Sequence, residues 1–408
     1  MDAKIKFIAL VLITIVFLEV VVRLAGHQDA DGDFYFLQYR LKPYNFPTQT
    51  ISQKIGEYDQ NPDGYLKYDG ALGWSIRPNS KSKNLLYASN SAGLRESGEV
   101  SIEKDSNTVR IAAFGDSFVH ADDVSNLQTW ESEAQTVLQQ RGVNAEVLNF
   151  GVPGYGIDQA YLRYQSMGKN YSPDIVLIGF QPENCFRNVN INRVFYTKST
   201  DIPLFKPRFV LGEGESLRLV DSPTPEPQSV ESTIAGFDSS PLAKWEYYYH
   251  ESDYDPNPAR SSKLFSLVEF LASTISEKWS RSEEAFYSMD SEGGMLCYSV
   301  LKQFESEAKN NGSQVYIIHF PFEKYVKKSM QGENIPYAAL LEKIKSSGSN
   351  VIDLEPLLEK KAKEKSLKEL FIPHYSPELN QSVGTCVGAS IDSAGTRDEN
   401  RGVSDCLA

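Results

Sequence analysis

The sequence is short of cysteine, short of positive charge relative to negative, and without a recognisable metal motif. Its four cysteines stand far apart and form no Cys-x-x-Cys pair, which excludes a dense disulfide framework and a cysteine-based zinc site. A single disulfide and ordinary thiols both remain compatible with that number. The formal net charge of -13 opposes binding to nucleic acid, so none is expected as a partner. No His-Glu-x-x-His or similar ligand set occurs, and neither a metal nor another cofactor is expected.

One long apolar run is present, at the amino end. Residues 7–18 carry no charge, and together with their neighbours they supply about 20 helical positions, enough to cross a bilayer core. Two lysines precede the run and favour a cytoplasmic amino end. We therefore predict that residues 1–25 are a transmembrane signal anchor, with the remaining chain in a bacterial periplasm or at the cell surface. A cleaved signal peptide is the alternative, because the uncharged run is short.

The rest of the chain divides by composition into three parts. Residues 26–108 are polar, aromatic and rich in turn residues, which predicts an arm packed on a main domain. Residues 109–385 carry the main domain, interrupted over 186–290 by an insertion without regular alternation. Residues 386–408 are small and polar, which predicts a flexible tail.

Within the main domain, apolar strands alternate with helical segments. The strands are short and apolar throughout, the pattern of strands buried on both faces of a parallel sheet. Strand–helix–strand repeats place helices on both faces, so the predicted fold class is α/β, with a mainly parallel five-stranded sheet. The five predicted strands begin at Val109, Ala145, Asp174, Gln314 and Asn350.

Four segments with polar side chains or clustered glycines follow strands or lie near the end of this domain. In a parallel sheet such loops share one edge, where ligands bind. A serine, a histidine, a backbone N–H and an amide side chain at one edge are the set that serine catalysis needs. The segments are Gly115-Asp-Ser117, Asn149-Phe-Gly-Val-Pro-Gly154, Gly179-Phe-Gln-Pro-Glu-Asn184 and His374-Tyr-Ser-Pro-Glu378.

The order and spacing of these segments resemble the SGNH, or GDSL-type, hydrolase superfamily, whose four sequence blocks supply Ser, Gly, Asn and His. Residues 109–184 and 313–383 carry the resemblance. The apolar amino end and the segments Leu72-Gly-Trp74 and Asn90-Ser-Ala-Gly-Leu-Arg95 resemble membrane-anchored bacterial members. The resemblance implies a three-layer α/β/α sandwich similar to flavodoxin, in agreement with the alternation of strands and helices described above.

The resemblance also implies roles for four residues. Ser117 would be the nucleophile and His374 the general base. The N–H groups of Ser117 and Gly154 and the side-chain amide of Asn184 would form the oxyanion hole. Gly154, and not Gly151, matches the glycine of the family's second block.

The sequence departs from the family pattern beside His374 and beside Asn184. Phe371 stands where the family usually has an aspartate that orients the histidine. In the third block the family usually has Asn-Asp, and this chain has Asn184-Cys185. His374 would then work with Ser117 alone, or with another acid, for which Glu369 and Asp353 are unranked candidates; a degraded site is a third reading. Two further histidines lie near the site in the sequence-based prediction. His120 is expected to be a partly exposed loop residue, and His319 is expected to be a packing residue.

The function expected from these residues is that of a serine esterase acting outside the cytoplasm on an acyl ester. One alternative is an O-acyltransferase or O-acetylesterase that acts on an acylated cell-envelope polysaccharide. A second alternative is a glycan-binding module that retains only the remains of a site.

Overall fold

The computed structural model describes residues 2–395, apart from residues 60, 97, 221–224 and 277–281. A five-stranded sheet lies at its centre, in the order β12-β11-β8-β6-β7, with every neighbouring pair parallel. The predicted fold class is therefore confirmed. The strands are β6 (Val109–Phe114), β7 (Ala145–Asn149), β8 (Ile175–Phe180), β11 (Gln314–His319) and β12 (Asn350–Asp353).

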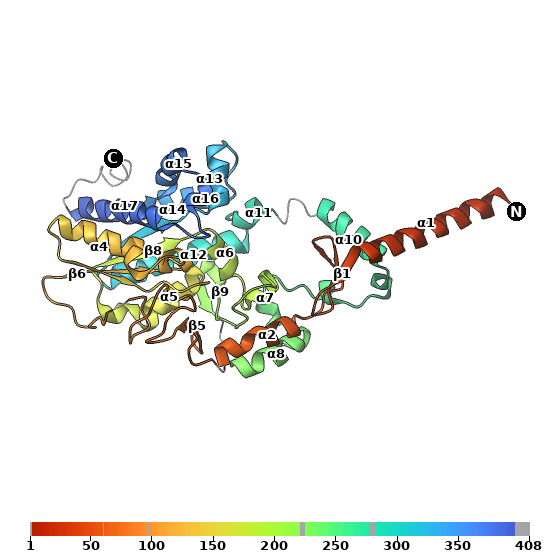
Figure 1. Cartoon of the computed structure of the whole chain (residues 1–408), viewed down its shortest axis with the longest axis horizontal. Coiled ribbons are helices and arrows are strands. Elements are labelled where there is room, and N and C mark those ends of the chain that lie inside the picture. Colours follow the sequence, from red (N-terminus) through yellow and green to blue (C-terminus); the bar gives the residue numbers. More distant parts are fainter. Residues whose placement is uncertain (1, 60, 97, 221–224, 277–281, 396–408) are drawn as a thin grey trace.

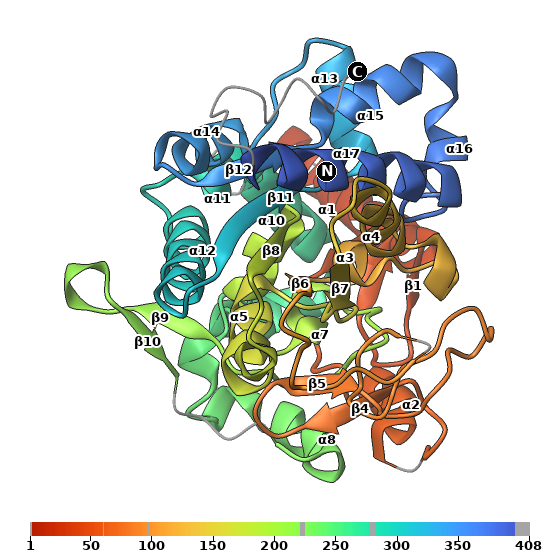
Figure 2. The ribbon, with the colours of Figure 1, turned by 90° about the vertical axis from the view of Figure 1, so that its left-hand side faces the viewer.

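Helices cover both faces of the sheet and make the three layers visible in Figure 2. One apolar core lies between the sheet and three helices: α5 (Ile157–Ser166), α12 (Glu292–Asn310) and α14 (Ala338–Ser346). A second core lies between the opposite face and five helices: α3 (Ser117–His120), α4 (Trp130–Gln140), α15 (Glu355–Glu364), α16 (Leu367–Leu370) and α17 (Pro377–Gly395). The short α13 (Glu323–Met330) contributes to both cores.

The carboxyl end of the described chain corrects one prediction. The flexible tail expected over 386–408 is wrong for residues 386–395, which continue α17 against α4; residues 396–408 lie outside the described residues. A Cβ on Gly384 would come within 2.4 Å of the Trp130 carbonyl oxygen, and one on Gly388 within 3.1 Å of the Ala134 oxygen. The small residues that suggested a loose tail are thus the surface on which two helices approach closely.

The amino-terminal region consists of a projecting helix and small sheets. The helix α1 (Ala3–Ala25) extends away from the sheet domain (Figure 1) and is long and apolar enough to cross a membrane. It is followed by a small antiparallel sheet, a helix and a hairpin. These are β1 (Gly26–Gln28), β2 (Phe34–Phe36), β3 (Tyr39–Leu41), α2 (Thr48–Asp59), β4 (Leu66–Asp69) and β5 (Gly73–Ile76).

The segment between β8 and α12 is built from short elements. The predicted hairpin is present, with β9 (Phe209–Leu211) antiparallel to β10 (Leu217–Leu219). A disulfide joins Cys185 to Cys297, so it ties the start of this segment to α12. The helices are α6 (Glu183–Asn188), α7 (Arg193–Tyr196), α8 (Pro227–Ala235), α9 (Glu251–Tyr254), α10 (Lys263–Ser276) and α11 (Glu283–Tyr287).

Candidate active site

Ser117 sits at the turn between β6, in the sheet interior, and α3. The Asp116 carboxylate accepts a hydrogen bond from the Phe118 N–H at 2.9 Å and so caps the short helix that Ser117 begins. A Cβ on Gly115 would lie 2.4 Å from Cγ2 of Val119, so only glycine lets the chain turn this tightly. The sequence therefore holds the serine hydroxyl at the carboxyl end of a central strand.

His374 contacts Ser117 directly. Its Nε2 lies 2.9 Å from Ser117 Oγ, and its Nδ1 lies 2.7 Å from Oδ2 of Asp123. The same carboxylate oxygen accepts the His374 backbone N–H at 3.3 Å. A carboxylate beside Nδ1 assigns the ring proton to that nitrogen, which leaves Nε2 as the acceptor for the serine hydroxyl. This is the arrangement of nucleophile, base and orienting acid that serine hydrolases use.

Asp123 was missed by the sequence reasoning, and both acids named there are wrong. The Glu369 carboxylate caps α16 through Ser366, and Asp353 pairs with His319 and Lys345. Asp123 follows Ser117 by six residues and has a φ of 72°, which turns its side chain back toward His374. The adjacent acidic pair after Gly-Asp-Ser was the available signal, but that backbone turn is not visible in the sequence.

The carboxylates around His374 change its pKa. Burial lowers the pKa of the ring, but the hydrogen bond to Asp123 and the charges of Asp122, Asp123 and Asp116 outweigh burial. The pKa of His374 is therefore raised above its usual value of 6.5. A raised pKa makes the neutral ring a stronger base toward the Ser117 hydroxyl and stabilises the imidazolium that forms after proton transfer.

The glycine turn after β7 offers one of the predicted oxyanion donors. Gly154 has a φ of 82°, and a Cβ there would lie 2.7 Å from Nη1 of Arg193. That guanidinium donates to the Gly154 carbonyl at 2.9 Å, so Arg193 fixes the orientation of the turn. Among the described residues, none accepts a hydrogen bond from the N–H of Ser117 or of Gly154.

Asn184 reaches the site through its neighbours. Its amide Nδ2 donates to Asp116 at 2.8 Å and to the Tyr155 carbonyl at 3.2 Å, so both hydrogens have acceptors. Arg187 donates to the same two acceptors, at 2.9 and 3.0 Å. Asn184 and Arg187 thereby tie the turn that carries Asp116 and Ser117 to the glycine turn after β7. An oxyanion would have to take one Asn184 hydrogen from its present acceptor.

His120 is a buried neighbour of the site and not a loop residue open to solvent. Its Nδ1 is hydrogen-bonded to Asp122, and its Nε2 lies 2.7 Å from the Tyr65 hydroxyl. Burial, the largest cause, lowers the pKa of His120 to about 4 despite Asp122, so the ring is neutral at neutral pH. Asp122 and Asp123 thus serve two different histidines from adjacent positions.

The amino-terminal arm contacts two loops of the site. The Arg95 guanidinium donates to the carbonyls of His120, Ala121 and Val124, which flank Asp122 and Asp123. On the glycine turn, Trp74 Nε1 donates to the Pro153 carbonyl at 2.9 Å. The arm therefore supports both the acid loop and the turn that carries Gly154.

A second histidine–aspartate pair lies at the edge of the sheet. His319 Nδ1 is 2.8 Å from Asp353, and its Nε2 is 3.2 Å from the Tyr337 hydroxyl. Donor atoms of His319, Asp353 and Glu355 lie within 4.8 Å of one another, close enough to hold a metal ion. Lys345, at 2.6 Å, already neutralises the Asp353 carboxylate, so this cluster is better described as an internal ion pair.

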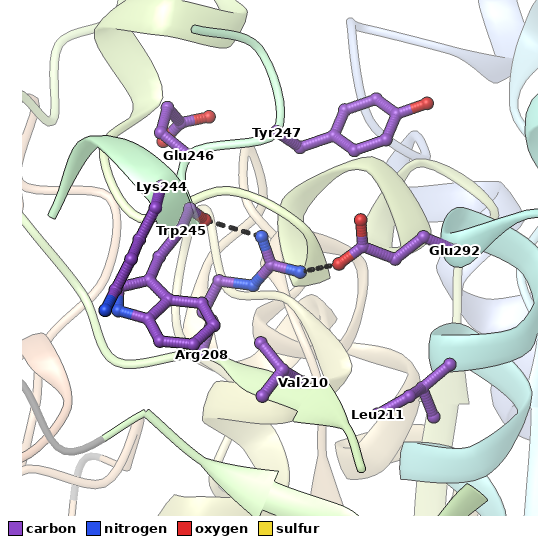
Figure 3. A pocket seen from close by; sticks show the side chains of 8 residues that line it. All are labelled: Arg208, Val210, Leu211, Lys244, Trp245, Glu246, Tyr247 and Glu292. Carbon is purple, nitrogen blue, oxygen red and sulfur yellow. Dashed lines mark hydrogen bonds and ion pairs between the residues drawn. The ribbon is translucent and has the colours of Figure 1, made fainter. Parts of the chain in front are cut away.

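A cavity of about 300 Å³ opens between β9 and α12 (Figure 3). Among the lining side chains, the Arg208 guanidinium lies between the Trp245 carbonyl and the Glu292 carboxylate. None of the 8 side chains that line it is a predicted site residue.

Comparison with known proteins gives structural likenesses only. No protein-family model matches the sequence, and no curated protein matches it. Among solved structures, a lipolytic protein of the G-D-S-L family from Veillonella parvula matches 71% of this chain and 98% of its own, at 11% identity and a TM-score of 0.35. A catalytic mutant of an acetylxylan esterase from Geobacillus stearothermophilus matches 68% and 90%, at 11% identity and a TM-score of 0.35.

An α/β hydrolase from the metagenome of Lake Arreo matches 72% of this chain and 98% of its own, at 10% identity and a TM-score of 0.37. G-D-S-L proteins, the group that the sequence resembles, are thus among the matched structures. At such identities and TM-scores, these likenesses assign no activity, and the chemistry has to be argued from the residues of this chain.

Proposed function

We propose that the protein is a serine esterase with Ser117 as nucleophile, His374 as general base and Asp123 as the acid that orients it. The observation that carries the proposal is the unbroken contact from Ser117 Oγ through the His374 ring to Asp123, at 2.9 and 2.7 Å. Because a carboxylate reaches His374, the site does not need the aspartate that Phe371 replaces. This contact also favours a working site over the remains of one.

The reaction follows from the geometry. Ser117 Oγ attacks the ester carbonyl carbon while His374 Nε2 takes the hydroxyl proton. The oxyanion receives hydrogen bonds from the N–H groups of Ser117 and Gly154, and from Asn184 when its longer bond, to Tyr155, is released. His374 then returns the proton to the leaving alcohol. Water then attacks the acyl-enzyme while His374 takes a proton from the water. His374 gives this proton back to Ser117 Oγ as the acid is released.

The location of the protein belongs to the same proposal: α1 anchors the chain in a membrane and the esterase domain lies outside the cytoplasm. Two observations support it. Glu19 in α1 accepts hydrogen bonds from Ser262, Lys263 and Leu264, and Val22 is buried; these contacts favour a retained helix over a leader that is removed. The disulfide between Cys185 and Cys297 fits an oxidising compartment.

The test is release of acetate from an aryl acetate and from acetylated xylan by the full chain in detergent. We expect turnover by the wild type and none above background by Ser117→Ala. The matched control is Ser376→Ala, which removes a buried hydroxyl two residues from His374 that is outside the proposed machinery. Turnover that survives in Ser117→Ala would contradict the proposal.

A further inference from the structure

The helix α10 lies beside the end of α1 that is nearer to the folded domain (Figure 1). Its first turn is bound by Glu19 of α1, whose carboxylate accepts the N–H groups of Lys263 and Leu264 at 3.0 and 2.8 Å. A negative charge at this position stabilises a helix amino end. These hydrogen bonds hold the start of α10 beside the last two turns of α1.

The side chains of α10 are apolar on more than one face. Leu264, Leu267 and Phe270 pack on the small cluster formed by Val22, Phe34 and Leu41. A neighbouring stripe of the helix carries Phe265, Val268 and Leu271, which are 44%, 56% and 51% exposed. In water a surface helix normally carries polar side chains on its outer face.

Charge is nearly absent from α10. Between Lys263 and Ser276 the sequence has one lysine, at the start, and one acid, Glu269. Both oxygens of Glu269 are bonded to Arg260, at 2.9 and 2.6 Å, so that charge is already neutralised. Nothing charged within the helix therefore opposes burial of its outer face in an apolar medium.

We propose that α10 lies in the membrane interface, with Phe265, Val268 and Leu271 among the lipid acyl chains. This inference rests on the proposed anchoring by α1. Because Glu19 binds the start of α10 where the apolar run of α1 ends, α10 begins at the level where α1 leaves the bilayer. Helices with such a face insert about 5–10 Å into the boundary between headgroups and acyl chains. The fold thus touches the membrane at two points, which fixes the orientation of the esterase domain.

The test uses the full chain reconstituted in phosphatidylcholine vesicles whose acyl chains carry bromine, a quencher of tryptophan emission on contact. Val268→Trp and Leu271→Trp are compared with two controls, and the emission of the wild-type tryptophans is subtracted. Phe7→Trp reports on α1, and Leu219→Trp reports on the exposed hairpin strand β10. Ester hydrolysis by each variant checks that it is folded.

We expect the added tryptophans at 268 and 271 to lose emission in brominated vesicles, most with bromine near the headgroups, while the one at 219 is unaffected. Loss at 7 but not at 268 or 271 would overturn the inference and leave the anchor standing. No loss at 7 would refute the anchor, and the inference with it. A blue-shifted but unquenched signal at 268 and 271 would mean that protein, such as a second copy of the chain, covers this face.

Discussion

The molecule contains two histidine–aspartate pairs whose local geometry is almost the same. In each, the ring Nδ1 lies within 2.8 Å of a carboxylate and Nε2 faces a hydroxyl: Ser117 for His374, and Tyr337 for His319. The surroundings differ. The His374 side chain is 21% exposed, whereas that of His319 is fully buried. A histidine–aspartate pair becomes a candidate site only when a nucleophile and access for substrate come with it.

The two pairs also differ in how the fold forms them. His319 and Asp353 are register partners on the neighbouring strands β11 and β12, so sheet pairing alone brings them together. Asp123 and His374 lie 251 residues apart and meet only through loops. The first pair stabilises the edge of the sheet, while the second depends on every element that holds its loops.

The largest expected difference concerns the two hydroxyls. Ser117→Ala should lower kcat by a factor on the order of 10⁶, because the nucleophile is lost. Tyr337→Phe, the equivalent change at the other pair, should leave kcat unchanged. Acetate release under saturating substrate measures both. Equal losses of kcat in the two variants would show that the hydroxyl beside His374 has no special role in the reaction.

The next comparison replaces each aspartate. Asp123→Asn should reduce kcat on the order of 10⁴-fold, because the His374 tautomer that accepts the serine proton is no longer favoured. Asp353→Asn should retain kcat but lose about 1–3 kcal/mol of stability, measured by denaturant unfolding, since the amide lacks the negative charge that binds His319 and Lys345. Loss of activity in Asp353→Asn, with activity retained in Asp123→Asn, would show that Asp123 is not the acid that orients His374.

The stability lost in Asp353→Asn should depend on pH. Burial raises the pKa of Asp353, but hydrogen bonds from His319, Lys345 and the Glu355 N–H outweigh burial and hold the pKa below its usual value of 3.8. A carboxyl with a depressed folded pKa stabilises the fold above its unfolded pKa and ceases to do so as the pH falls through the folded one. The Tm difference between the variant and the wild type should therefore shrink in acid.

A smaller effect is expected from the amino-terminal arm. Arg95→Leu removes the guanidinium that binds three carbonyls around Asp123 and should lower kcat by up to about 10²-fold through misplacement of the acid. Arg95→Lys should recover part of the loss. Arg77→Leu is the matched control, because Arg77 binds, among the described residues, only carbonyls within the arm, those of Asn61 and Gly64. Similar kcat losses at both arginines would indicate general unfolding and not positioning.

The smallest expected effect is a shift of the acid limb of the kcat/KM profile. His374 acts as a base only when neutral, and its raised pKa places the limb above pH 6.5. In Asp123→Asn the main stabiliser of the imidazolium is lost while burial remains, so the limb should move to lower pH. His319→Gln should not move it. If the acid limb moved in His319→Gln and not in Asp123→Asn, His374 would not be the general base.

Most of the fold is predictable from the sequence, because short apolar strands such as 175–180 are typical of a buried parallel sheet. Sequence reasoning also named Ser117 and His374, which the structure places in contact. It could not find Asp123, since the choice between two adjacent aspartates depends on left-handed backbone at Ala121 and Asp123. Nor could it see that Gly384 and Gly388 serve close helix packing, because small residues also occur in loose tails.

The central claim is that Ser117 is a nucleophile activated by the His374–Asp123 pair, and covalent labelling tests it most directly. The full chain would be treated with a fluorophosphonate, and mass spectrometry would locate and time the adduct. We predict a single adduct on Ser117 that forms quickly in the wild type and in Asp353→Asn, and far more slowly in Asp123→Asn and His374→Ala. No adduct on Ser117, or labelling that slows in Asp353→Asn but not in Asp123→Asn, would contradict the account.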